Sequence, residues 1–62
     1  MSDQTFLFRD SISNEEAVVI VRRSDESVGI CLSLESNGDT EVFLNPTDLR
    51  KLIQALENSL AV

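Results

Sequence analysis

The chain of 62 residues is long enough for one small domain, residues 1–62, near the lower end of what folds alone. Its hydrophobic content of 42% predicts a folded protein, and no apolar run approaches the roughly 20 residues that cross a bilayer. Eleven acidic and five basic residues give a net charge of −6, which disfavours nucleic acid as a partner.

The compartment is predicted from the N-terminus and the cysteine count. Met1 to Gln4 are polar and acidic, without the basic and apolar regions of a signal peptide. The single cysteine, Cys31, cannot form a disulfide within the chain. A cytoplasmic protein without a membrane segment is therefore expected.

Four strand-like stretches precede one helical stretch, and polar loops at 11–15 and 24–26 separate the first three. The strand-like stretches are 5–9, 16–23, 28–34 and 40–44, and the helix starts near Pro46. The order predicts an α+β fold (ββββα). We expect a four-stranded antiparallel meander with the C-terminal helix packed on one sheet face.

The second predicted strand is apolar on both sides. Ala17 to Val21 read Ala-Val-Val-Ile-Val, although successive side chains of a strand point to opposite faces. Both faces therefore need a cover, and the chain contains one obvious cover, the helix. A second copy of the chain is the simplest cover for the other face, which predicts a homodimer.

The hairpin between the third and fourth strands has two candidate registers. Asn37-Gly38 fits a two-residue type I′ turn, which would place Val42 on the opposite face from Leu32. A loop of Ser36, Asn37 and Gly38, with Gly38 left-handed, instead places Leu32 opposite Val42. The apolar pattern favours the second register, because a slip of one residue would turn every side chain over.

The helix carries the clearest pattern in the chain. Asn45 can cap it, Pro46 fits its first position, and Asp48 lies near the positive end of the helix dipole. Its apolar stripe comprises Leu49, Leu52, Ile53, Leu56 and Leu60. This stripe is predicted to cover the sheet face formed by Phe6, Phe8, Ala17, Val19, Val21, Ile30, Leu32, Val42 and Leu44.

The opposite sheet face is predicted to carry an interface. A Ser24-Asp25 turn between the second and third strands sets Val21 opposite Val28. Val18 then lies opposite Cys31, and Ile20 lies opposite Gly29. In the favoured register of the next hairpin, Phe43 lies opposite Cys31 on its other side. The resulting apolar patch comprises Leu7, Val18, Ile20, Cys31 and Phe43. A charged rim of Arg9, Arg22, Glu16 and Glu41 surrounds it. An apolar cluster with such a rim is typical of a dimer or partner interface.

Residue types needed for catalysis are missing. The chain has no histidine, which is the commonest general base, and Cys31 lies in mid-strand as expected of a small buried hydrophobe. Glu35, Asn37, Asp39 and Glu41 alternate like calcium ligands, but Gly38 and Pro46 stand where that loop needs other residues. No enzyme activity, cofactor or metal is therefore expected.

These observations favour a small acidic, non-enzymatic interaction or regulatory module that acts as a homodimer. One alternative is a nucleic-acid-associated protein (single-strand binding or transcription-related) that uses Arg9, Arg22 and Arg23 of the dimer as candidate anion contacts. Another is an acidic decoy that inhibits a nucleic-acid-binding protein. The element order is similar to that of small dimeric single-strand-binding domains, without a shared motif. The acidic balance argues against the same function.

Overall fold

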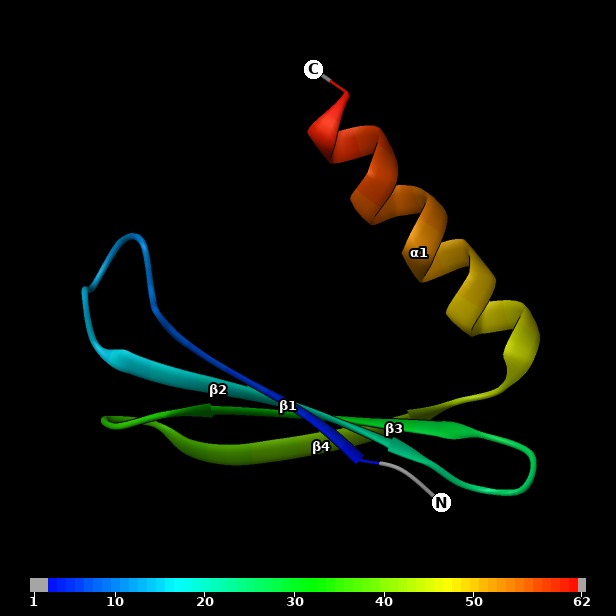
Figure 1. Cartoon of the computed structure of the whole chain (residues 1–62), viewed down its shortest axis with the longest axis horizontal. Helices are drawn as coiled ribbons and strands as arrows, with labels where there is room; N and C mark the ends of the chain where they lie inside the picture. The colour runs from blue at the N-terminus through cyan, green and yellow to red at the C-terminus, as the bar shows by residue number, and fades with distance from the viewer. Residues whose placement is uncertain (1–2, 62) are drawn as a thin grey trace.

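Four antiparallel strands form one open sheet in the order β1-β2-β3-β4, and a single helix follows the last strand (Figure 1). The computed structural model describes residues 3–61. Val62 and two residues of the polar N-terminus from which the compartment was predicted, Met1 and Ser2, lie outside this range. The elements are β1 Asp3–Arg9, β2 Glu16–Arg23, β3 Val28–Leu34, β4 Gly38–Leu44 and α1 Pro46–Leu60. The predicted ββββα order and the antiparallel meander are confirmed.

Two strands begin two residues earlier than predicted. β1 starts at Asp3, which pairs with Arg22 of β2, and β4 starts at Gly38, which pairs with Leu34 of β3. Polar residues occupy both added ends, where a strand pairs through its backbone and needs no apolar side chain. Hydrophobic alternation therefore gives no signal for these ends.

Both predicted registers are displaced by two residues. Val21 lies opposite Ile30 where Val28 was predicted, and Val42 lies opposite Ile30 where Leu32 was predicted. The reason is loop length. The β2–β3 connection extends to Ser27, whose carbonyl accepts a hydrogen bond from the Ser24 N–H at 3.0 Å. The β3–β4 turn begins earlier than predicted, directly after Leu34. A displacement of two residues leaves every side chain on its predicted face.

Gly38 has the predicted left-handed backbone, with φ of 72°. The Asn37 N–H donates to the Leu34 carbonyl at 3.3 Å, so residues 35–37 form the turn and Gly38 leads into β4. Glycine suits this position because a Cβ makes a positive φ costly.

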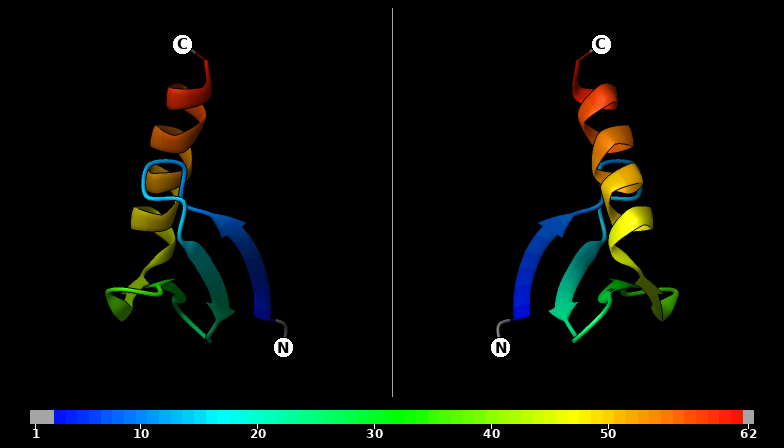
Figure 2. Two further views of the ribbon diagram at one scale, coloured as in Figure 1. Left: turned by 90° about the vertical axis from the view of Figure 1, so that its left-hand side faces the viewer. Right: turned by 90° about the vertical axis from the view of Figure 1, so that its right-hand side faces the viewer.

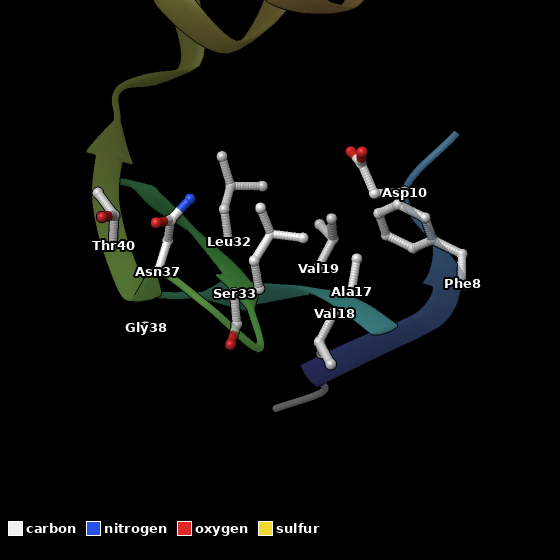
Figure 3. Close-up of a pocket in the computed structure, with 11 residues that line it drawn as sticks. Phe8, Asp10, Ala17, Val18, Val19, Leu32, Ser33, Asn37, Gly38 and Thr40 are labelled. Atoms are coloured by element: carbon white, nitrogen blue, oxygen red, sulfur yellow. The ribbon is translucent and has the colours of Figure 1, made fainter. Parts of the chain in front are cut away.

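The two faces of the sheet differ in composition. We call the side from which α1 rises the inner face; its apolar residues are Phe6, Phe8, Ala17, Val19, Val21, Val28, Ile30, Leu32, Leu34, Val42 and Leu44. Figure 3 shows Phe8, Ala17, Val19 and Leu32 pointing to this side, and Val18 and Ser33 pointing to the opposite, outer face.

The start of α1 follows the predicted capping. Asn45 is the N-cap, and its side-chain oxygen accepts from the Asp48 N–H at 2.8 Å. Pro46 lies at the first helical position, and Asp48 is the acidic residue of the first turn. Short-range chemistry determines this end of the helix, which explains why the sequence predicted it.

The helix does not pack on the sheet, and this part of the predicted fold is wrong for the single chain. α1 meets chiefly β4, the strand it follows, and projects away from the sheet in both views of Figure 2. None of its residues is buried, and Ile53, Leu56 and Leu60 are 46%, 58% and 86% exposed.

The joint before α1 explains this projection. Asn45 alone separates β4 from α1, and its backbone is extended, with φ of −75° and ψ of 169°. A residue before proline avoids the helical region, and proline fixes its own φ. Two restricted residues in succession therefore prevent the sharp reversal that would lay α1 on its own sheet.

Candidate interaction surfaces

Very little apolar surface is buried in the single chain. Ala17 and Cys31 are the only buried hydrophobic residues within residues 3–61. Small domains have a thin stability margin even with a complete core. The large exposed apolar side chains lie in four places: the inner face, the outer face, the α1 stripe and the loop between β1 and β2, where Ile12 is 95% exposed.

The outer face carries the patch predicted from the sequence. The observed pairs Leu7–Val18, Ile20–Cys31 and Gly29–Phe43 place all five predicted residues on this face. Leu7 and Phe43 are 78% and 61% exposed, whereas Cys31 is buried. The patch therefore presents two prominent apolar side chains, near opposite edges of the sheet.

Arg22 contacts carboxylates of both β1 and β4 on the outer face, near the end of β2. Its Nη1 lies 3.3 Å from both carboxylate oxygens of Glu41, and its Nε lies 3.8 Å from Asp3 Oδ2. These contacts reach from β2 to β4 and to β1. Such partly exposed ion pairs contribute little free energy individually, but they orient the charged rim beside the patch.

Gly29 makes the close approach over β3 possible. A Cβ at this position would lie 2.7 Å from Cε2 of Phe43 and 3.1 Å from Oε2 of Glu41. The absence of a side chain therefore lets the Phe43 ring and the Glu41 carboxylate lie against the strand. The predicted register placed Ile20 opposite Gly29, whereas Arg22 and Phe43 lie opposite it in the structure.

Gly29→Ala should lower the free energy of unfolding by roughly 1 kcal/mol, because the added methyl displaces the Phe43 ring. The same substitution in a Phe43→Ala background should cost much less, since the closest clash is gone. Chemical denaturation of the four proteins measures this coupling. Gly38→Ala is the control. An added Cβ at Gly38 would have no atom within 4 Å, so the loss of stability comes from the positive φ of 72° and should not depend on residue 43. Equal costs of Gly29→Ala in both backgrounds would contradict the proposed contact.

The three candidate anion contacts are not gathered in the single chain. Arg22 and Arg23 are successive residues of β2 and point to opposite faces. Arg22 is engaged by Asp3 and Glu41, and Arg9 Nη1 donates to the Asn14 carbonyl at 2.9 Å at the far end of β1. A phosphate could not contact all three on one chain.

The loop between β1 and β2 is organised by Asp10, which the sequence analysis did not single out. Its Oδ2 accepts from the N–H groups of Ser13 and Ile12 at 2.7 and 3.1 Å, and Asn14 adopts a positive φ of 63°. The backbone N–H of Ser13, then its hydroxyl, then the Ile12 N–H lower the pKa of the Asp10 carboxyl. The Asp-Ser-Ile-Ser pattern was the available signal for this turn.

Glu15 connects this loop to the β3–β4 turn. Its Oε1 accepts from the Ser36 N–H at 2.9 Å. Hydrogen bonds from the Ser36 side chain and then its backbone lower the pKa of the Glu15 carboxyl. The ionised form therefore favours the folded chain, because the unfolded chain lacks these donors.

The stabilisation from Glu15 should be complete above the usual glutamate pKa of about 4.3 and be lost as the pH falls through its lower folded pKa. Glu15→Ala should therefore differ most from the unsubstituted protein near neutral pH, and the two should converge in acid. Thermal unfolding measured from pH 7 down to about pH 3 tests this. Glu26→Ala, in the exposed β2–β3 turn, is the matched control for removal of a surface carboxylate. A constant difference at every pH would refute the role of the ionised group.

The inner face is hollowed over β2 and β3 beneath the 10–15 loop (Figure 3). The hollow measures about 420 Å³, and Phe8, Ala17, Val19, Leu32 and Leu34 form its apolar lining. Phe6, Leu32 and Val42 of the same face are 52%, 54% and 53% exposed. The sequence predicted that α1 covers this face, so its exposure in the single chain was not expected.

Comparison with protein-family models, curated proteins and solved structures finds no match for this chain. Within residues 3–61, no group of three or more potential metal ligands occurs, and no helix there is long and apolar enough to cross a membrane.

Proposed function

We propose that this protein is a small acidic, non-enzymatic interaction or regulatory module of the cytoplasm that acts as a homodimer. The observation that carries the proposal is the scarcity of buried hydrophobic residues: among those described, only Ala17 and Cys31 are buried, while large apolar side chains are exposed on both sheet faces and on α1. Exposed apolar surface on this scale is typical of association surfaces.

The outer patch of Leu7, Val18, Ile20, Cys31 and Phe43 is the proposed interface for the dimer or for a protein partner. The projecting Leu7 and Phe43 supply anchoring groups, and Arg22, Asp3 and Glu41 supply an ordered polar rim. Apolar anchors surrounded by polar groups are the usual anatomy of a protein interface.

The mass in solution tests the homodimer. Light scattering at micromolar concentration should give twice the 6.9 kDa chain mass. A mass of one chain that persists at high concentration would overturn the homodimer.

The partner surface is tested by affinity capture from the native host. The tagged protein is compared with a Leu7→Ser, Phe43→Ser double variant whose mass and melting temperature are measured first, because loss of the dimer would place the dimer interface on the outer patch. The proposal requires specific protein partners that the double variant loses. Identical capture by both proteins would remove the outer patch from the proposal.

Nucleic-acid binding at physiological salt should be weaker than about a micromolar Kd, because few phosphates can be neutralised and the net charge is −6. Fluorescence anisotropy with labelled single- and double-stranded oligonucleotides, at low and physiological salt, measures it. Tighter binding that disappears in an Arg22→Ala, Arg23→Ala double variant would establish the nucleic-acid alternative. Binding confined to low salt and insensitive to these substitutions is non-specific.

A further inference from the structure

We propose that the homodimer forms by reciprocal exchange of helices: α1 of each chain lays its apolar stripe on the inner face of the other chain. This inference rests on the proposed homodimer and specifies how it is built. The stripe (Leu49, Leu52, Ile53, Leu56 and Leu60) and the inner face are both apolar, and in the single chain each lacks a cover. A second copy supplies the missing partner for both.

The joint at Asn45 directs α1 toward another chain. Its extended backbone and the following Pro46 hold the helix away from its own sheet. A connection this short prevents the helix from reaching its own inner face, although it leaves the helix free to reach another. Short hinge segments favour exchange of an element between chains for this reason.

The dimensions of the two surfaces match. A helix of 15 residues is about 22 Å long, and a strand of 7 residues extends about 23 Å. The 10–15 loop and α1 both rise from the inner side of the sheet in Figure 1 and leave the inner face open between them. The hollow of about 420 Å³ on that face provides space for side chains of the incoming stripe.

The exposed area of the chain is too large for a compact monomer and suits an exchanged dimer. The accessible surface is 5146 Å², whereas a compact monomer of 6.9 kDa exposes about 4,000 Å². The excess of about 1,100 Å² exceeds the roughly 800 Å² that each partner buries in a standard interface. The radius of gyration, 12.8 Å, is likewise larger than the about 11 Å of a compact chain of this length.

Exchange covers more apolar surface than direct stacking of two inner faces. Stacked sheets would leave both α1 stripes in water, whereas exchange covers the stripe and the inner face of each chain together. The polar side of α1, with Arg50, Lys51, Gln54, Glu57 and Asn58, remains in water. The arrangement has the two-fold symmetry of most homodimers, and it leaves the outer patch available to a partner.

Lengthening the hinge tests the exchange directly. A flexible insert of about six residues between Leu44 and Asn45 spans up to about 20 Å and lets α1 fold back onto its own sheet. The lengthened linker gives α1 a millimolar effective concentration at its own inner face. This exceeds the concentration of other chains at about 50 μM, so the variant should become a folded monomer there. The same insert between Asp25 and Glu26, in the exposed β2–β3 turn, is the control and should leave the dimer intact.

Contacts between chains are measured in the unsubstituted protein, so the test does not depend on a variant that folds. In a sample mixed from isotope-labelled and unlabelled chains, isotope-filtered nuclear Overhauser spectra should show Leu56 methyl protons near inner-face protons of the other chain. A dimer that lacks these contacts, or keeps its full affinity with the lengthened hinge, overturns the exchange and leaves the proposed homodimer standing. A monomeric unsubstituted protein overturns both.

Discussion

Leu56→Ala should weaken the homodimer and lower the free energy of unfolding by roughly 2 kcal/mol per chain, although Leu56 is 58% exposed in the single chain. A substitution at a genuinely exposed position changes stability by only about 0.5 kcal/mol. The larger expected effect follows from the proposed packing of the α1 stripe on the inner face of a second chain. Chemical denaturation at several protein concentrations measures both consequences, because the stability of a dimer rises with concentration.

Lys51→Ala is the matched control for Leu56→Ala. Lys51 lies on the polar side of the same helix and is exposed, and alanine keeps the helical propensity high. The control should change neither the mass nor, beyond about 0.5 kcal/mol, the stability. If Leu56→Ala behaved like Lys51→Ala, the α1 stripe would be in water in the native protein.

Ile30→Ala should produce the larger loss, about 2–5 kcal/mol, which is enough to unfold a domain of this size. Ile30 lies in the middle of the inner face, directly between Val21 and Val42, so truncation removes contacts within the sheet and with the cover. Circular dichroism and thermal melting measure the loss. The concentration dependence of melting should persist only if some folded dimer remains.

Phe43→Ser is the contrasting substitution on the outer face. Phe43 is 61% exposed and lies outside the surface that the helix exchange covers. Its replacement should leave the mass unchanged and alter the melting temperature little. A loss of the dimer in Phe43→Ser with the dimer retained in Leu56→Ala would move the dimer interface to the outer face.

The sequence alone determined the features that depend on neighbouring residues. Asn45, Pro46 and Asp48 predicted the start of α1, and Gly38 predicted a left-handed turn residue, because capping and turn chemistry act within a few positions. The apolar alternation assigned each residue to its sheet face, including the five residues of the outer patch. That assignment holds despite a register error of two residues, because side chains repeat with a period of two.

Tertiary structure decided the exact pairings and the position of the helix. Loop closure at Ser27 and Leu34 set the registers, through backbone hydrogen bonds that do not depend on the side chains of these residues. The amphipathic pattern of α1 predicted that its apolar stripe packs against another apolar surface. The pattern does not indicate whether that surface belongs to the same chain or to a second one. The joint of Asn45 and Pro46 holds α1 away from the sheet that it was predicted to cover, which leaves a second chain as the proposed cover.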